Sequence, residues 1–178
     1  MRGFGLFLGM VFAAASVAAQ SHKEAARANV AIAVELCSAS YPSSEAWLGA
    51  FRAAGFAERV ENLGNGDLNH HFTAPADTAS AVIYLGQMAP DCTVTTRYMG
   101  VTETSQMIGA MLEQRSPGKY LRSDLPGSTA APADQSPVCA VFTERGVELP
   151  ELIAISSARG DNICIEDGTS RIYIATLV

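Results

Sequence analysis

The order of hydrophobic patterns along the chain constrains the fold more than any other feature. Helical spacing predicts helices at residues 22–38 and 43–54, and from Phe56 onward the pattern changes to one typical of strands. One further helix is expected from Thr102 to Arg115, with β-type patterns after it. Because strands and helices do not alternate, no parallel sheet is required. The sequence therefore predicts an α+β fold with an N-terminal helical hairpin, an antiparallel β-sheet and a third helix packed on it.

Capping residues support the second of these helices. Ser43 is a suitable N-cap because its hydroxyl can accept a hydrogen bond from an unpaired amide of the first turn. At the other end, Gly55 followed by Phe56 fits a Schellman ending, in which the glycine adopts a left-handed conformation. In the first helix, Cys37 follows Val30 at helical spacing, so we expect its side chain to face inward.

Runs of β-type residues predict two hairpins before the third helix. The first joins residues 57–63 to residues 68–74, and the Asn65-Gly66 pair between them is a strong short-range hairpin signal. The second joins residues 80–86 to residues 92–98. Both hairpins are expected to belong to the antiparallel sheet.

Four further strands are expected after the third helix, at residues 138–143, 151–156, 162–166 and 170–178. The Asp167-Gly168 pair predicts a type I′ turn between the last two of them. In that register Ile163 lies opposite Ile172, and Cys164 points to the other face of the sheet.

The first 19 residues have the pattern of a secretory signal peptide. A basic start precedes an apolar run of about a dozen residues and a small-residue end, in which Val17 and Ala19 fit a cleavage site before Gln20. The run is shorter than the roughly 20 residues that a membrane-spanning helix needs, so we expect no membrane anchor. Residues 20–178 are then expected to form a single domain in the periplasm or outside the cell.

Four cysteines are expected to form two disulfides in such an oxidising compartment. They are Cys37, Cys92, Cys139 and Cys164, and three pairings are possible. We predict Cys139–Cys164 because both lie on strands expected to be neighbours, which leaves Cys37–Cys92 as the second bridge.

The charge of the chain argues against nucleic-acid partners. The formal net charge is −6, and removal of residues 1–19 takes away Arg2 and no acidic residue, which leaves 11 basic and 18 acidic residues and a charge of −7. Proteins that bind nucleic acids or anionic lipid surfaces usually carry clustered Lys and Arg, and this sequence has no such cluster.

Two of the three histidines, His70 and His71, are adjacent in the second predicted strand. Neighbouring residues of a strand point to opposite faces, so these imidazoles cannot ligate one ion together. A two-residue Asn65-Gly66 turn would place Glu61 opposite His70, whereas a three-residue loop would place Val60 there. Both registers remain open from the sequence.

The histidines suggest two kinds of chemistry. His70 with Glu61 is a candidate catalytic pair, and His70 and Asp67 are candidate metal ligands, although zinc requires three or four convergent ligands. Cleavage before Gln20 would make His22 the third residue, where the free amine, two backbone nitrogens and the imidazole suit square-planar Cu(II) or Ni(II). We favour structural roles for these histidines and expect no metal and no cofactor.

Residues 116–137 are rich in Pro, Gly, Ser and Ala and are predicted to form a long loop. Such loops are binding elements or mobile linkers, and the composition favours a linker. Tyr120 and Arg122 are its candidate ligand-binding residues. Arg97, on the second predicted hairpin, could also meet an anionic ligand, although a solvated position explains it as well.

Familiar catalytic signatures are absent from the sequence. It lacks the motifs of zinc-dependent proteases, serine hydrolases, P-loop NTPases and dithiol oxidoreductases. A cysteine nucleophile would need a thiolate, whereas disulfides are expected here. We therefore expect an exported, non-enzymatic binding or accessory protein of the cell envelope, whose partner is a small ligand or another envelope protein. The alternative is a small histidine-dependent hydrolase or a metal-binding protein.

Overall fold

The computed structural model has three α-helices, a short 3-10 helix and one eight-stranded antiparallel sheet among the residues that it describes. It describes residues 8–41, 43–87, 89–123, 138–159 and 164–176, with side chains from Ser21 onward. The helices are α1 (Leu8–Cys37), α2 (Ser44–Ala53), the 3-10 helix Pro75–Asp77 and α3 (Val101–Arg115). The strands are β1 (Ala57–Gly64), β2 (Asp67–Thr73), β3 (Ser80–Leu85), β4 (Asp91–Thr96), β5 (Tyr120–Ser123), β6 (Ala140–Glu144), β7 (Glu151–Ser156) and β8 (Ser170–Thr176). The predicted α+β class is confirmed.

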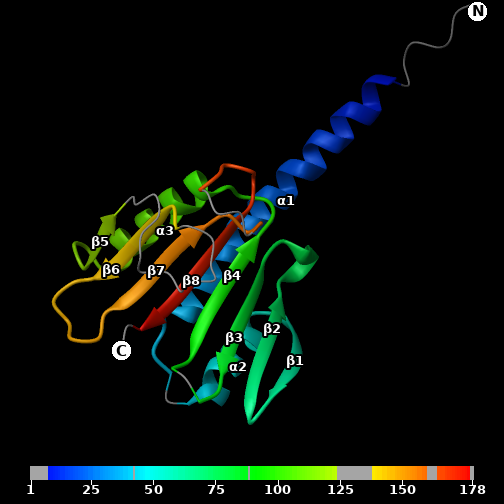
Figure 1. The fold of residues 1–178 in the computed structure, drawn as a ribbon. Helices are drawn as coiled ribbons and strands as arrows, with labels where there is room; N and C mark the ends of the chain where they lie inside the picture. The colour runs from blue at the N-terminus through cyan, green and yellow to red at the C-terminus, as the bar shows by residue number, and fades with distance from the viewer. Residues whose placement is uncertain (1–7, 42, 88, 124–137, 160–163, 177–178) are drawn as a thin grey trace, which may run out of the picture.

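The strands follow the order β1-β2-β3-β4-β8-β7-β6-β5 across the sheet, and each neighbouring pair is antiparallel. The last strand of the chain, β8, therefore lies between β4 and β7 and joins the first four strands to the other three. The three α-helices lie on one face of the sheet (Figure 1). Helix α1 packs on β3, β4 and β8, and α3 packs on β5, β7 and β8.

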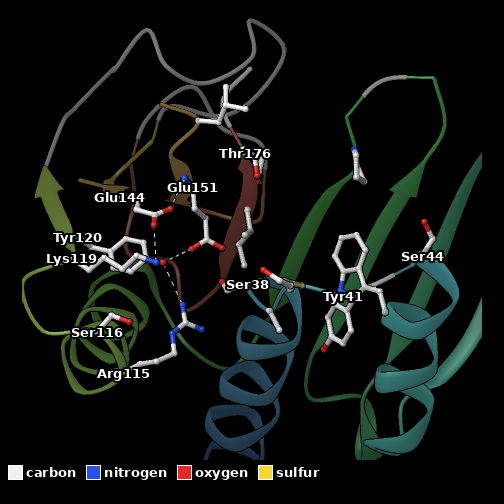
Figure 2. Close-up of a pocket in the computed structure, with 18 of the residues that line it drawn as sticks. Ser38, Tyr41, Ser44, Arg115, Ser116, Lys119, Tyr120, Glu144, Glu151 and Thr176 are labelled. Atoms are coloured by element: carbon white, nitrogen blue, oxygen red, sulfur yellow. Dashed lines mark hydrogen bonds and ion pairs between the residues drawn. The ribbon is translucent and has the colours of Figure 1, made fainter. Parts of the chain in front are cut away.

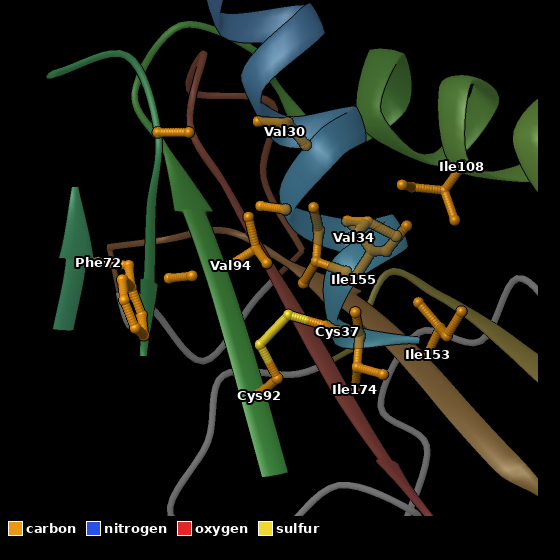
Figure 3. Close-up of a cluster of buried hydrophobic side chains, with 14 of the residues drawn as sticks. Val30, Val34, Cys37, Phe72, Cys92, Val94, Ile108, Ile153, Ile155 and Ile174 are labelled. Carbon is orange, nitrogen blue, oxygen red and sulfur yellow. A yellow bond between two sulfur atoms is a disulfide. The ribbon is translucent and has the colours of Figure 1, made fainter. Parts of the chain in front are cut away.

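Two rows of buried side chains cross the helix-covered face of the sheet (Figure 3). Both rows follow from the strand registers, because directly opposed residues of neighbouring strands share a face. The first row consists of Phe72, Ala81, Val94, Ile172, Ile155 and Ala140. The second consists of His70, Ile83, Cys92, Ile174, Ile153 and Phe142. His70 thus occupies a core position in a row that is otherwise apolar.

The ends of α2 agree with the sequence. Ser43 is the N-cap, and its hydroxyl accepts a hydrogen bond from the Ala46 amide at 3.2 Å. At the C-terminus, the Phe56 amide donates to the Phe51 carbonyl and the Gly55 amide donates to the Arg52 carbonyl, as in a Schellman motif. Gly55 has a φ of 85°. The predicted cap and Schellman ending are confirmed.

Helix α1 begins earlier than the sequence pattern indicated. Its backbone is helical from Leu8 instead of residue 22, so the predicted signal peptide and the first predicted helix are continuous here. No Gly or Pro lies between residues 11 and 37, and the segment is rich in Ala, the residue with the highest helix propensity. Residues 1–7 of the predicted signal peptide lie outside the described residues.

The β1–β2 hairpin adopts the second of the two registers considered. Val60, not Glu61, lies opposite His70, and the register shifts between Asn62 and Gly64 near the turn. Asn65 in the turn has a φ of 55°, a left-handed conformation that asparagine tolerates well. The prediction that the two histidines point to opposite faces is confirmed by this pairing.

The predicted C-terminal hairpin is wrong. Strand β8 pairs with β4 and β7, and Cys164 to Glu166 lie in a loop, while Ile163 lies outside the described residues. Asp167 makes a local turn instead, because its Oδ1 accepts hydrogen bonds from the amide and hydroxyl of Thr169 at 2.9 and 2.7 Å. An Asp-Gly pair can therefore form a local turn at the end of a loop as well as the turn of a β-hairpin.

The long predicted loop contains a strand. Residues 120–123 form β5, which pairs with β6 at the edge of the sheet. This strand has four residues, of which only Tyr120 and Ser123 are partly buried and none is fully buried, so it has little hydrophobic pattern and was not recognised from the sequence. Residues 124–137 of the predicted loop lie outside the described residues.

Both predicted disulfides are present. Cys37–Cys92 links the end of α1 to the start of β4 within the core, and Cys139–Cys164 links the residue before β6 to the loop before β8. The second pairing is right although its premise was wrong, since Cys164 is not on a strand. Among the described residues, no helix combines the length and apolar character needed to span a membrane.

Candidate functional site

A cleft of about 950 Å³ opens where the C-terminal ends of α1 and α3 approach the start of α2 (Figure 2). Residues of β5, β6, β7 and β8 complete its lining. Pockets for small molecules in proteins typically measure about 300–1,000 Å³, so this cleft has the size of a ligand site. Its two side walls differ in chemistry.

One wall is a network of charged groups. Lys119 Nζ lies 2.7 Å from Glu144 Oε1, and Glu144 Oε2 accepts a hydrogen bond from the Glu151 amide at 3.3 Å. The hydrogen bond from Lys119 holds the pKa of Glu144 below its ordinary value. Glu144 is therefore an ionised carboxylate whose charge Lys119 already balances.

Tyr120 lies at the centre of this wall. Its hydroxyl donates a hydrogen bond of 2.6 Å to Glu151 Oε2 and accepts one of 3.4 Å from Arg115 Nη2. Burial, together with the Glu151 carboxylate, raises the pKa of Tyr120. Tyr120 consequently remains a neutral phenol at physiological pH, and the predicted ligand-binding candidate lies in the cleft.

The opposite wall is aromatic. Tyr41, from the α1–α2 connection, stacks on Trp47 of α2 with ring centroids 6.4 Å apart and an interplanar angle of 18°. The Trp47 indole donates a hydrogen bond of 3.0 Å to the Leu36 carbonyl near the end of α1. This bond orients the indole ring before any ligand arrives, so the aromatic wall is pre-organised.

Helix α1 ends between the two walls (Figure 2). Cys37, held by its bridge to Cys92, and Ser38 both line the cleft at this point. The Ser38 hydroxyl oxygen is buried and has no hydrogen-bond partner among the described residues. A buried, unsatisfied hydroxyl is unusual in proteins, and here it borders the cleft.

The adjacent histidines belong to two separate pairs, and neither histidine lines the cleft. His70 Nδ1 lies 2.7 Å from Glu58 Oε1, and only 6% of the residue is exposed. On the other face of the sheet, His71 Nε2 lies 2.8 Å from Glu61 Oε2. The structure therefore does not bring His70 and Glu61 together as a catalytic pair.

The remaining candidates are dispersed over the molecule. Asp67 accepts a hydrogen bond of 3.1 Å from a backbone amide of the β3–β4 turn, and Arg97 pairs with Asp77. The His22 ring packs against the Tyr98 ring at a centroid distance of 5.7 Å. In the described part of the chain, no three His, Cys, Asp or Glu residues are grouped closely enough to hold a metal ion.

Arg122, the last candidate, lies on β5 but does not line the cleft. Its guanidinium carbon is 5.8 Å from the centroid of the Phe142 ring, which is a cation–π distance.

Sequence reasoning missed most of the cleft. Trp47 fitted the apolar face of a helix, and Arg115 was only the last residue of another helix. Lys119 belonged to a predicted loop and Glu151 to a predicted strand, and neither position indicated a site, because their partners Glu144 and Tyr120 lie 25 and 31 residues away in the chain. One signal could have drawn attention to Trp47 as a candidate for the site, namely that it is the single tryptophan of the sequence.

Comparisons of the chain with models of known protein families, with curated proteins and with solved structures found no match. The residues of the cleft are therefore the basis for its chemistry. Hydrogen-bond donors and carboxylates on one wall, with aromatic rings on the other, suit a molecule that has both a polar part and a planar apolar part.

Proposed function

We propose that this protein is an exported, non-enzymatic binding protein of the cell envelope that holds a small ligand in the cleft between Tyr120 and Trp47. The observation that carries the proposal is the cleft itself, which has ligand size and two walls of different chemistry.

Three features support export. The sequence begins with the pattern of a signal peptide, and two disulfides are typical of oxidising compartments. Helix α1 also contacts the body of the protein through residues beyond the proposed cleavage site, since Lys23 pairs with Glu103 at 2.7 Å and His22 packs on Tyr98. Loss of residues 1–19 would leave these contacts intact.

A histidine-dependent hydrolase has less support. His70 is almost completely buried, and its partner Glu58 is in turn bonded to Arg52 Nε at 2.6 Å. A general base must reach the proton that it removes from a substrate. His70 is better explained as a satisfied core residue.

The proposed function can be tested with a neutral aromatic dye. N-phenyl-1-naphthylamine fluoresces when it binds an apolar site, and Trp47, the single tryptophan, can transfer excitation energy to it. We expect saturable energy transfer from Trp47 to the dye in a preparation with both disulfides intact. Tyr41→Ala should weaken dye binding about tenfold, because it removes half of the aromatic wall.

The matched control is Tyr98→Ala, which removes an aromatic ring outside the cleft. It should leave the affinity for the dye unchanged. Equal effects of the two substitutions, or no saturable transfer in the unmodified protein, would show that this cleft is not the binding site.

A further inference from the structure

The cleft contains one cationic group that its own neighbours do not neutralise. Lys119 is paired with Glu144, and the Glu151 carboxylate accepts a short hydrogen bond from Tyr120. Arg115, by contrast, has no carboxylate within ion-pair distance among the described residues, and its hydrogen bond to the Tyr120 hydroxyl is long, at 3.4 Å. Most of the guanidinium donors of Arg115 are therefore free to meet a ligand.

The acidic groups of the same wall already have partners in Lys119 and Tyr120. The hydrogen bond from Lys119 lowers the pKa of Glu144, which keeps this ion pair intact near neutral pH. Glu151 Oε2 faces the Tyr120 hydroxyl. An incoming cation would share Glu151 with the Tyr120 hydroxyl, whereas an incoming anion meets guanidinium donors of Arg115 that have no carboxylate partner among the described residues.

Resting on the proposed function, we infer that the ligand is an organic acid with an aromatic or similarly planar apolar body. Its carboxylate or sulfonate group accepts hydrogen bonds from Arg115, and its planar part lies against the rings of Tyr41 and Trp47. Arginine binds such anions with parallel hydrogen bonds, and the stacked rings supply a flat apolar surface. The two walls thus recognise the two ends of one molecule.

A matched pair of dyes tests the class of ligand. 8-Anilino-1-naphthalenesulfonate shares the ring system of N-phenyl-1-naphthylamine and adds a sulfonate. We expect the anionic dye to bind about tenfold more tightly than the neutral dye, since a charge-assisted hydrogen bond contributes an effect of this size. Arg115→Gln should abolish this difference, because it removes the cation that the sulfonate meets.

Arg59→Gln is the control for the loss of one positive charge, because Arg59 lies on β1 outside the cleft lining. It should retain the tenfold preference. A thermal unfolding curve for each variant establishes that both remain folded. If Arg115→Gln unfolds the protein, Arg115→Lys serves instead, and it should reduce the preference because lysine lacks the planar fork of donors.

Competition with simple molecules distinguishes the sign of the ligand charge. 1-Naphthoate should displace the anionic dye at a concentration about tenfold lower than 1-naphthylmethylamine needs, because both share the aromatic wall and only the acid meets Arg115. Displacement by the amine at an equal or lower concentration, or an unchanged preference in Arg115→Gln, would overturn the inferred ligand class. In either case Tyr41-dependent binding of the neutral dye would still support the proposed binding function, so the two ideas can fail separately.

Discussion

His70 and His71 are one residue apart, yet they belong to different regions of the molecule. His70 lies on the helix-covered face of β2 with 6% of the residue exposed, and it contacts Glu58. His71 lies on the opposite face, where 27% of its side chain is exposed and its partner Glu61 is 45% exposed. Each imidazole is 2.7 or 2.8 Å from a carboxylate, so the two pairs have almost the same geometry.

The difference between these pairs is their surroundings. Glu58 also accepts a hydrogen bond of 2.6 Å from Arg52 Nε, and the Phe51 ring stacks on Phe72 in the same layer at a centroid distance of 4.7 Å. Exposed ion pairs contribute little because water screens them and their side chains lose entropy. The comparison teaches that burial, and not the distance between the two groups, decides how much a His–Glu pair contributes to the stability of the fold.

The largest expected effect comes from Phe72, the apolar neighbour of His70 on the inner face. Phe72→Ala should destabilise the protein by about 4 kcal/mol, because it leaves a cavity in a fully buried site and removes the stack with Phe51. Urea unfolding at neutral pH measures this. Thr73→Ala, on the exposed side of the same strand, should change stability by less than about 0.5 kcal/mol.

His70→Ala is expected to cost about 2–3 kcal/mol. The substitution leaves a cavity and removes a hydrogen-bond partner from Glu58, which is only 16% exposed. Urea unfolding again gives the free energy of unfolding. A loss below about 0.5 kcal/mol would mean that the buried and exposed pairs are equivalent, and the comparison would fail.

Glu58→Gln should alter the pH dependence of stability. The hydrogen bond from Arg52, and then that from His70, holds the pKa of Glu58 below its ordinary value of 4.5. The ionised carboxylate therefore stabilises the fold above that value, and this contribution is lost as the pH falls through the lowered pKa. The stability difference between the original protein and Glu58→Gln should therefore shrink as the pH falls below about 4.5.

Unfolding curves at a series of pH values check this expectation, with Glu61→Gln as the outward-facing control. The control should differ little from the original protein at any pH, because its carboxylate is half exposed. A stability difference for Glu58→Gln that stays constant with pH would contradict the proposed role of the ionised carboxylate.

The smallest expected effect is that of His71→Ala. Its ion pair with Glu61 is exposed, so the change in the free energy of unfolding should stay within about 0.5 kcal/mol. The same urea measurement applies. A loss as large as that of His70→Ala would show that the outer face of β2 is covered in solution.

Local features were predictable wherever their cause lay within a few residues. The Ser43 cap and the Schellman ending at Gly55 and Phe56 are examples, because each depends on hydrogen bonds within one turn. The start of α3 was predicted to within one residue, at Thr102 instead of Val101, but the partner of its first turn was not. The Thr102 amide donates to the Glu166 carboxylate at 2.8 Å, and this partner comes from a loop 64 residues away.

The cleft shows the same limit for the candidate site. Tyr120 was a candidate before the structure, because it was one of few residues in its segment with apolar surface to bury. The hydrogen bond from Tyr120 to Glu151 could not be predicted from the sequence, since the two residues are 31 positions apart and the contact depends on β5 joining the edge of the sheet. Arg115 and Trp47 are likewise brought to one cleft only by the packing of α2 and α3 beside α1.

By itself the sequence determined the ends of α2, the position of the β1–β2 turn but not its register, and the opposite faces taken by His70 and His71. These depend on backbone geometry and side chains that are close along the chain, so a short segment contains the whole cause. Only the tertiary structure decided that β8 pairs with β4 and β7, and that Arg115 and Trp47 line the same cleft. Such contacts depend on which distant segments bury the most apolar surface together, and no single segment contains that information.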